Sequence, residues 1–556
     1  MEPPANFPPP PRSRFHAAAF HGAWIVLLLL AAGWRFSFPL TPAIDKDFSG
    51  YLHPALDALG GRAFAHADGR AILYPALVYA LLAGCRDFRA ITIVQHTLGL
   101  ATGLLLLATW CAAWRALRPA RLPRWLYDLA GLAMCAAFFF TPQPVQFEFL
   151  IRPDVICPFF AALSFFFIVR FLLAWRVEKN ARAFLGFGVA AVFTAFVLPS
   201  LKPSYWLSSI FTTLPVWCAL FDRREKGVRR LLLAVLPLAA VWLLLIMPER
   251  RSSRGDTSSA TFLPESLFSI HALIIREQLA ADVAAPDPAV PYPPEKLRAT
   301  LALLDDGIAA ALRENPGHMA SLGYDADYLL YRAPFFTKLA EADHWALEPR
   351  LGFYRYYYLR TWKKRPGPML GKVTGQLALF YNLECPAYCN HGFDMAKYYR
   401  IADMLMQQPD EQARIAAWPP AVAFRDSLAA IKDRRTEIGM RKLLRHATNR
   451  LGNCYLPGLL AWLASLPWIL WRAERRARYG IFAAILAVGY AFNFGNNLGI
   501  AILHTLEVSR YTYIQFATTL LTEMLTAVYL LDVALGLGAP FFARGKESAP
   551  AVTALL

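Results

Sequence analysis

Two aspartates, Asp45 and Asp47, follow directly on the first long apolar segment of the chain, within the stretch Pro42–Tyr51. A carboxylate can take a proton from an attacking hydroxyl group or bind a divalent cation. The apolar segment before them has the length of a membrane-spanning helix. We therefore expect both carboxylates at a membrane surface, in contact with water, where they are the first candidates for catalytic groups.

Further ionisable side chains stand at the ends of later apolar segments. If those segments span a membrane, all of them lie on the same side as the two aspartates. Arg and Lys at such a place can hold a phosphate group. One charged residue alone is as well explained as an anchor at the membrane interface, but a set of them is a hypothesis for a site, because ionisable groups at this depth are costly. The set comprises Glu148, Arg152, Asp154, Lys202, His504, Glu507, Arg510 and Tyr511.

The composition predicts an all-α polytopic membrane protein. Of the 556 residues, 56% are hydrophobic and 17% are charged, whereas about a quarter are charged in a typical soluble protein. The apolar residues form continuous blocks of roughly 17–25 residues, which is the length of a spanning helix. The net charge of +17 does not indicate a nucleic-acid partner, because the Lys and Arg residues cluster in short connections between the blocks, as in cytoplasmic loops of membrane proteins.

About ten transmembrane helices satisfy this charge pattern, with both termini in the cytoplasm. Residues 72–84 are apolar but only 13 long, so we expect a juxtamembrane helix there. Counting this segment as a span would move Arg115–Arg124 to the outer side, against the positive-inside rule. The expected spans are 17–36, 91–114, 126–142, 155–174, 183–200, 204–221, 231–247, 455–471, 479–503 and 511–535.

The spans divide the chain into five parts: a cytoplasmic tail (1–16), a transmembrane module (17–247) with a first outer loop (37–90), a large mainly helical extracytoplasmic domain between spans 7 and 8 (248–453), C-terminal transmembrane helices (454–538) and a second tail (539–556). The aromatic run 353–362 is expected against the membrane surface. Cys385, Cys389 and Cys454 would allow a disulfide if this region is extracytoplasmic; unpaired cysteines are an equal alternative.

Three motifs resemble a known family. Asp47-Phe-Ser-Gly-Tyr-Leu-His-Pro-Ala-Leu-Asp-Ala-Leu-Gly-Gly61, followed by Arg70-Ala-Ile-Leu-Tyr-Pro-Ala-Leu77, resembles the first outer loop of the GT-C glycosyltransferases, which include protein mannosyltransferases and lipid A aminoarabinose transferases. Phe149-Leu-Ile-Arg-Pro-Asp-Val155 resembles the segment with the family's second acidic residue, and Ser509-Arg-Tyr511 resembles a late Arg-Tyr pair. The resemblance covers residues 17–247 and, more loosely, 455–535.

The resemblance implies an inverting glycosyltransferase with a polyprenyl-phosphate-linked sugar donor and a lipid, glycan or protein acceptor. Asp47 would be the general base or would orient the acceptor. Asp45 is the alternative, because the family often has two adjacent acidic residues and Lys46 separates these two. Asp154 would support the acceptor or a divalent metal. Arg510, Lys202 and Arg152 are candidates for binding the donor phosphate, and Tyr51, Glu148 and Tyr511 for positions near the substrate.

Three other functions remain open from the sequence, and one of them, a scaffold that acts through the outer domain, is not excluded by any feature of the sequence. A polysaccharide polymerase or ligase of the O-antigen type also has many spans and one large outer loop, but it would depend on arginines and a histidine in that loop. A lipid or solute transporter would place its charges near the bilayer midplane, whereas here most charges stand at segment ends. The high content of Ala, Arg and Pro favours a bacterial inner membrane, with the site on the periplasmic face and membrane lipids around the spans.

Overall fold

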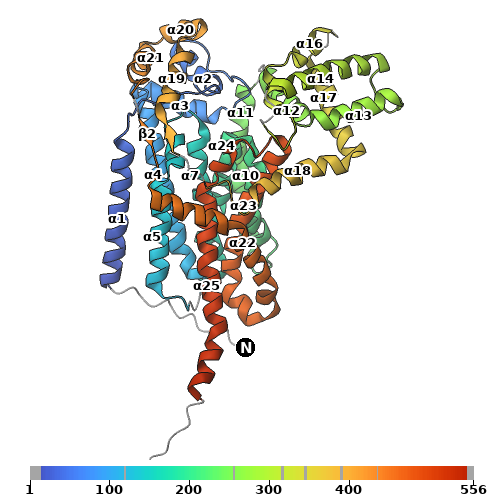
Figure 1. Cartoon of the computed structure of the whole chain (residues 1–556). Helices are drawn as coiled ribbons and strands as arrows, with labels where there is room; N and C mark the ends of the chain where they lie inside the picture. Colours follow the sequence, from blue (N-terminus) through green and yellow to red (C-terminus); the bar gives the residue numbers. More distant parts are fainter. Residues whose placement is uncertain are drawn as a thin grey trace, which may run out of the picture.

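The structure is a computed structural model that describes residues 14–117, 121–253, 257–314, 319–342, 347–388, 392–434 and 436–547. Its centre is an upright bundle of helices, with the ends of the described chain at the lower side (Figure 1). The bundle comprises α1 (Arg14–Phe36), α4 (Arg89–Ala113), α5 (Arg124–Phe140), α6 (Pro142–Glu148), α7 (Ile156–Leu173), α8 (Ala181–Leu201), α9 (Trp206–Ala219), α10 (Gly227–Val241), α22 (Lys442–Trp471), α23 (Ala473–Leu503) and α25 (Phe516–Glu547).

The bundle has the dimensions of a polytopic membrane protein, as the sequence predicts. In the described residues, eight helices are long and apolar enough to cross a membrane, or nine if the bent pair α5 and α6 is one span. The expected span 204–221 corresponds to α9, whose 14 residues are shorter than the length that a spanning helix needs. The segment expected as a juxtamembrane helix is α3 (Leu73–Cys85), a short apolar helix beside α2 (Ser49–Leu59).

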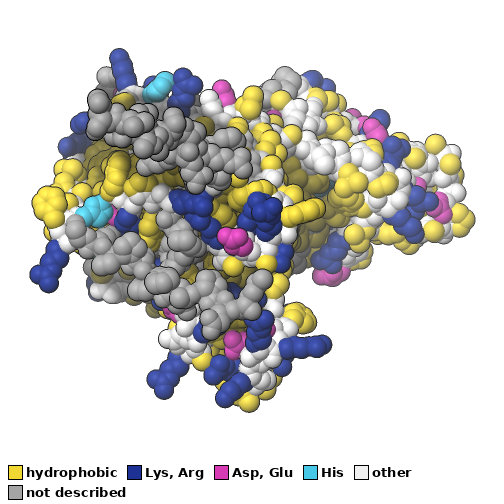
Figure 2. Space-filling model, turned by 90° about the horizontal axis from the view of Figure 1, so that it is seen from below, with side chains coloured by type: hydrophobic (Ala, Val, Ile, Leu, Met, Phe, Trp, Pro, Cys, Tyr) yellow, Lys and Arg dark blue, Asp and Glu magenta, His cyan; other side chains and the backbone are white. Residues whose placement is uncertain are grey.

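The lower end of the bundle is rich in basic side chains, which Figure 2 shows around the face seen from below. They belong to the short connections between bundle helices, including the 3₁₀ turn η1 (Trp114–Ala116) and the π-helical turn η3 (Ala174–Glu178). This is the end that the positive-inside rule assigns to the cytoplasm. The described basic residues are Arg115, Arg121, Arg124, Arg176, Lys179, Arg182, Arg223, Arg224, Lys226, Arg229, Arg230, Arg472, Arg475, Arg476 and Arg478.

A bend of 48° separates α5 from α6. Pro142 has no backbone N–H and disfavours helical geometry in the residue before it, so Thr141 is extended (φ −78°, ψ 131°) and α5 ends there. The bend turns α6 away from the bundle axis. As a result the chain from Phe149 to Asp154 runs across the upper end of the bundle before α7 descends.

Two groups of short helices cover the upper end (Figure 1). In the first, α19 (Met395–Met406), α20 (Pro409–Ala416) and α21 (Pro419–Ile431), with the antiparallel strands β1 (Phe393–Asp394) and β2 (Glu437–Ile438), pack on α2 and α3. Ion pairs fasten this contact: Arg414 Nε lies 3.0 Å from Asp57 Oδ1, and His53 Nε2 lies 2.8 Å from Glu411 Oε1.

The second group is an outer lobe with a hydrophobic core of its own. Residues 248–453, expected as one domain, contribute to three cores: residues 268–357 form the core of the lobe, residues 395–438 join the core around α2 and α3, and residues 380–388 join the core of the bundle. The lobe comprises α12 (Thr257–Ile270), α13 (Ala272–Ala284), α14 (Pro294–Glu314), α15 (Ala326–Tyr331), α16 (Phe335–Ala342) and α17 (Leu347–Lys364), while α11 (Met247–Ser252), with the π-helical turn η5 (Trp242–Ile246), and α18 (Pro366–Phe380) join it to the bundle.

The aromatic run 353–362 lies in this lobe, and its expected position against the membrane is wrong. Phe353, Tyr354 and Tyr357 each have 0% exposure, because they pack with Phe268 in the core of the lobe. Arg360, three residues after Tyr357 on the same buried face of α17, pairs with Asp282 at 2.7 Å. Burial of aromatic area stabilises the lobe itself.

Candidate active site

Three arginines from distant parts of the chain surround Asp47. Asp47 Oδ2 accepts hydrogen bonds from Arg152 at 2.7 Å and from Arg510 at 2.6 Å. On the other oxygen, Oδ1 lies 3.2 Å from Arg70 Nη2. The side chain of Asp47 is still 28% exposed. This carboxylate is therefore paired, yet open to a molecule that approaches from the upper side.

Arg152 joins all three predicted aspartates. Besides its bond to Asp47, its guanidinium donates to Asp45 and lies 3.4 Å from Asp154 Oδ2. The backbone N–H of Asp47 donates to Asp45 Oδ1 at 3.1 Å. Since only 9% of the Arg152 side chain is exposed, its charge needs these carboxylate partners in order to be buried.

Asp154 and Lys202 form the inner part of the cluster. Lys202 Nζ donates to Asp154 Oδ1 at 2.9 Å, and the Asp154 side chain is only 2% exposed. The same ammonium group lies 4.8 Å from the centre of the Tyr511 ring. A cation at this distance over an aromatic face is attracted by the ring. Lys202 is thus held on two sides.

Two tyrosines frame the cations. The Arg510 guanidinium lies 5.0 Å from the ring centre of Tyr511, and its Nη2 donates to the Tyr511 hydroxyl at 3.3 Å. The Arg70 guanidinium lies 5.5 Å from the ring centre of Tyr51. We define the charged cluster as Asp45, Asp47, Arg70, Arg152, Asp154, Lys202 and Arg510.

Backbone pairing brings the first two loops of this cluster together. Ala43 and Leu150 form a parallel bridge: Ala43 N–H donates to Phe149 C=O at 2.8 Å, and Ile151 N–H donates to Ala43 C=O at 3.0 Å. Asp45 and Asp47 follow the bridge on one side and Arg152 follows it on the other. The bridge therefore fixes the register that puts the aspartates against the arginine.

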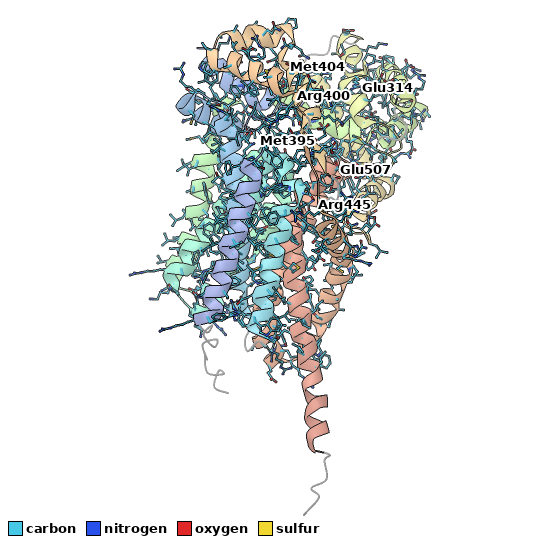
Figure 3. The ribbon with its side chains drawn as sticks, turned by 60° about the vertical axis from the view of Figure 1, so that its left-hand side comes forward. Glu314, Met395, Arg400, Met404, Arg445 and Glu507 are labelled. Atoms are coloured by element: carbon cyan, nitrogen blue, oxygen red, sulfur yellow. The ribbon has the colours of Figure 1, made fainter. Side chains whose placement is uncertain are left out.

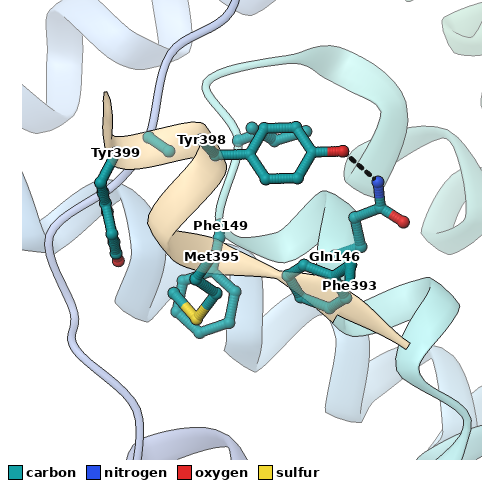
Figure 4. A pocket seen from close by; sticks show the side chains of 8 residues that line it. Gln146, Phe149, Phe393, Met395, Tyr398 and Tyr399 are labelled. Atoms are coloured by element: carbon teal, nitrogen blue, oxygen red, sulfur yellow. Dashed lines mark hydrogen bonds between the residues drawn. The ribbon is translucent and has the colours of Figure 1, made fainter. Parts of the chain in front are cut away.

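Side chains of α19 close the outside of this bridge (Figure 4). Gln146 Nε2 donates to the Tyr398 hydroxyl at 2.6 Å, and the Tyr399 hydroxyl donates to Thr41 C=O at 2.9 Å. The side chains around Ala43 and Leu150 leave no space for even a water molecule. This crevice is a packing contact that stabilises the two loops.

Prolines and a turn position the remaining cations. Pro153 and Pro203 begin the 3₁₀ turns η2 (Pro153–Val155) and η4 (Pro203–Tyr205), so the residues before them, Arg152 and Lys202, are extended and lie outside α7 and α8. Arg510 and Tyr511 lie in α24 (Ser509–Tyr513), a short helix between α23 and α25. All three elements end at the upper side of the bundle.

Arg70 joins the cluster although it was not predicted as a site residue. Gly50 makes room for it: a Cβ atom at Gly50 would lie 2.3 Å from Arg70 Cγ, a distance at which something must shift. Arg70 stands within the motif that precedes α3, so its place in that motif was the available signal. Gly50 and Arg70 together give Asp47 its third cation.

The outer lobe contributes residues that no local pattern indicates. Burial raises the pKa of Tyr331, at the end of α15, to about 12, and the charges of Arg70 and Asp47 act on this pKa in opposite directions. Phe262 of α12 lies 5.5 Å from the Arg70 guanidinium, measured to the ring centre. Asp327 Oδ1 lies 3.3 Å from His504 Nε2. The lobe therefore borders the charged cluster.

Glu148 does not join the charged cluster. It is fully buried between α1, α4 and α6, where Arg35 Nε donates to it at 2.9 Å and His96 Nδ1 lies 2.8 Å from its Oε2. Gly99 leaves the space for it, since a Cβ atom there would lie 2.0 Å from Glu148 Oε1. With no exposed surface for a substrate, Glu148 fixes three helices instead. Glu507, another predicted outer-face residue, accepts from the backbone N–H of Ser321 at 3.0 Å.

Burial and charge shift the proton affinities in the cluster. Burial raises the pKa of Asp45, with Arg152 opposing it. For Lys202 burial acts to lower the pKa, but Asp154, Tyr511 and Cys157 together outweigh it, so the pKa of Lys202 is raised and the ammonium form is favoured. Burial raises the pKa of Tyr51 to about 12. Tyr51 therefore keeps its proton at neutral pH.

The charged cluster carries four cations and three carboxylates, which leaves one positive charge in excess. In the described residues no group of three or more His, Cys, Asp and Glu side chains is arranged to hold a metal ion. The three aspartates do not fit a shared metal here, because each faces a cation rather than another carboxylate. The arrangement instead fits an anionic ligand that competes for the cations.

The predicted disulfide is only partly described. Cys385 is buried and Cys454 is exposed, and both are free thiols. Cys389 lies outside the described residues.

Comparison with known protein families, with characterised proteins and with solved structures finds no match to this chain.

Proposed function

We propose that this protein is a membrane glycosyltransferase that moves a sugar, with inversion, from a polyprenyl-phosphate-linked donor to an extracytoplasmic acceptor. One observation carries the proposal: three aspartates, three arginines and a lysine converge at the end of the helical bundle opposite to its basic end. The positive-inside rule then orients the cluster to the outer side, with about ten spans and both termini in the cytoplasm.

The excess positive charge supports a lipid-phosphate donor. A sugar linked to a lipid through one phosphate carries a single negative charge, and the departing lipid monophosphate carries up to two. The cluster has one cation in excess, which matches the donor. Arg152, Lys202 and Arg510 can stabilise the second charge as it develops on the leaving group.

Binding of the donor phosphate would also free the catalytic carboxylate from its arginine partners. Arg510 and Arg152 both donate to Asp47 Oδ2. A bound phosphate offers these guanidinium groups other acceptor atoms, and Asp47 can then accept the proton of the acceptor hydroxyl. Asp45 is the second candidate for the base, because it shares Arg152 with Asp47 and is 17% exposed.

In the proposed reaction the acceptor oxygen attacks the anomeric carbon on the face opposite to the phosphate. The new C–O bond forms as the bond to the phosphate oxygen breaks, and the hydroxyl proton passes to the carboxylate of Asp47. Asp154 keeps Arg152 and Lys202 in place beneath the phosphate. Tyr51 and Tyr511 border the cations where the sugar would lie.

The test is mass spectrometry of envelope lipids and glycans from a deletion strain and from the same strain carrying wild type, Asp47→Asn or Asp87→Asn at matched expression. Asp87 is an exposed carboxylate whose one ion pair among the described residues is with nearby Arg89, so it is the matched control. We expect one sugar to disappear in the deletion, to return with wild type and Asp87→Asn, and to stay absent with Asp47→Asn. If Asp47→Asn restores everything, Asp47 is not the base and a ligase or transporter becomes the better explanation.

A further inference from the structure

A cavity of about 470 Å³ lies on the other side of α24 from the charged cluster. Ser509, Thr512 and Tyr513 line it, whereas Arg510 and Tyr511 of the same helix contact the cluster. Residues three or four positions apart share one face of a helix, so these two sets lie on different faces. The cavity is thus a direct neighbour of the site proposed for the donor phosphate.

The cavity differs from the cluster in charge. Two carboxylates, Glu384 and Glu507, belong to its lining, and no Lys or Arg is among the lining residues in the described chain. The volume is in the range of small-molecule sites. An anionic phosphate is repelled by this surface and attracted by the cluster, so the donor phosphate does not belong here.

The lining is instead suited to hydroxyl groups. Carboxylate and amide side chains each offer several hydrogen-bonding atoms. Asn449 and Asn453 stand one turn apart on α22, and both are exposed. In the described part of the chain their side chains and the carboxylate of Glu384 make no hydrogen bond, while the backbone N–H of Glu384 donates to Asn382 Oδ1 at 2.6 Å. The polar lining residues are Glu384, Asn449, Asn453, Glu507, Ser509 and Thr512.

Aromatic and apolar groups supply the rest of the wall. Tyr388 and Tyr513 line the cavity together with Leu379, Pro386 and Leu506. The Tyr388 hydroxyl donates to the buried Glu523, which holds the ring in place. Sugars present both hydroxyl edges and C–H faces, and an aromatic ring packs well against the latter.

The position also fits a ligand from the aqueous side. Asn449 and Asn453 precede residue 455, where the predicted eighth span begins. In Figure 3, Glu507 is labelled near the upper end of the bundle, above Arg445 of α22. The cavity is therefore at the level where the proposed outer membrane surface meets water.

We propose that this cavity binds the acceptor, as a saccharide that is neutral or carries an amino group. The assignment of this saccharide as the acceptor rests on the proposed transferase function. Donor phosphate and acceptor sugar would then occupy sites of opposite charge on the two faces of α24. Asp47 lies at the phosphate site, and the acceptor would reach Asp47 past Tyr511.

Saturation-transfer NMR on the purified full-length protein in detergent tests this site, with chitotriose, maltotriose and the glucosamine trimer as probes. We expect signals from at least one probe with wild type. Asn453→Trp fills the cavity and should lower the affinity of the protein for the probe about tenfold or more, because the hydrogen bonds made in the cavity are lost. Cys454→Trp, at the adjacent exposed position outside the lining, should leave the signals unchanged. Excess inorganic phosphate should not displace the probes.

Glu384→Gln is the second variant, because it lies in an exposed loop and removes only a charge. Glu384→Gln should weaken the binding of the glucosamine trimer more than the binding of maltotriose. No signal from any probe, signals that survive Asn453→Trp, or displacement by phosphate would each overturn the assignment. If the probes bind but the envelope glycan does not depend on Asp47, the transferase proposal fails while the saccharide site stands. If the glycan depends on Asp47 but no probe binds, the cavity assignment alone fails.

Discussion

At the scale of single residues, Asp47 holds the most exposed carboxylate of the three aspartates in the cluster, with 28% exposure against 17% for Asp45 and 2% for Asp154. A base must be reached by its substrate, and it must be near the cations that hold the leaving group. Of the three aspartates in the cluster, Asp47 is the one that pairs with both Arg152 and Arg510. This makes it the first choice for the base.

Replacing Asp47 by Asn should lower turnover about 10²- to 10⁴-fold, the usual contribution of general base catalysis. The change keeps the size of the side chain, the residue is partly exposed, and Arg152 keeps Asp45 and Asp154 as partners, so the thermal unfolding midpoint should fall only slightly. Initial rates of sugar transfer in membranes, with equal protein levels, measure the effect. Asp45→Asn in parallel decides between the two aspartates: the larger loss identifies the base.

Arg510→Ala should raise the KM for the donor about 10- to 100-fold, because a hydrogen bond to a charged group is worth about 1.5–3 kcal/mol. Arg510→Lys keeps the charge but loses the fork of two N–H groups that reach Asp47 and Tyr511, so it should recover only part of the affinity. Donor titrations at saturating acceptor separate KM from kcat. An unchanged donor KM in Arg510→Ala would remove Arg510 from the phosphate site.

At the scale of elements, the fully buried pair of Arg35 and Glu148 ties α1 to α6 and sets where the loop with Arg152 begins. Glu148→Gln leaves Arg35 without its countercharge in the bundle. Removing one partner of a buried pair typically costs about 3–5 kcal/mol. We expect a clearly lower thermal midpoint in detergent, and a partial recovery in the double variant Arg35→Met with Glu148→Met. A wild-type midpoint for Glu148→Gln would contradict this role.

The contact between α15 and the end of α23 should depend on pH. Burial opposes protonation of His504, but Tyr511 and Asp327 outweigh it, against a further opposing effect of Lys372, and the pKa of His504 is raised above its ordinary value of 6.5. The stabilisation from its ion pair with Asp327 is therefore complete below pH 6.5 and is lost as the pH rises through the pKa in the folded protein. Because Asp327 is 39% exposed, this ion pair contributes less than about 1 kcal/mol to stability.

Hydrogen exchange of α15 measures this contact. After correction for the intrinsic rate, residues 326–331 should exchange up to about fivefold more slowly at pH 6 than at pH 8, which corresponds to that upper limit. His504→Gln should remove the difference between the two pH values. If the difference persists in His504→Gln, a titratable group other than His504 causes the pH dependence of this contact.

The helical elements and the cluster differ in how far the sequence predicts them. The long apolar blocks predict most bundle helices, since spanning length and continuous hydrophobicity leave few alternatives. Asp47, Asp154, Lys202 and Arg510 were chosen because each stands at the outer end of an apolar segment, and such ends meet at one surface of a bundle. Tyr331 and Phe262 follow no such rule, because they arrive through the packing of a separate lobe.

Glu148 and the aromatic run show the limit of that rule. Glu148 has the same sequence context as Arg152, but the bend at Pro142 turns it inward to Arg35. Nothing near it in the sequence indicates a partner 113 residues away. The aromatic run was assigned to the membrane because aromatic residues favour that interface, yet the same residues also form soluble cores.

At the scale of the whole molecule, the proposed function depends on orientation. The charged cluster and the basic connections lie at opposite ends of the bundle, so only one of them can face the cytoplasm. A polyprenyl-phosphate donor that serves an extracytoplasmic acceptor must be reached from the outer side. The orientation can be tested without knowledge of the sugar or the acceptor.

Two introduced cysteines report the orientation: Arg62→Cys, exposed in the first outer loop, and Arg224→Cys, exposed in the connection between α9 and α10. The background variant has the exposed native residues Cys85, Cys218 and Cys454 replaced by Ser and measures residual labelling. A maleimide that cannot cross the inner membrane should label Arg62→Cys in intact cells with a permeable outer envelope, and Arg224→Cys only after the membrane is opened. Basic residues are retained on the cytoplasmic side during insertion, which gives this expectation its direction. The reverse pattern would put Asp47 and the saccharide cavity in the cytoplasm, where a donor and an acceptor on the outer surface cannot reach them.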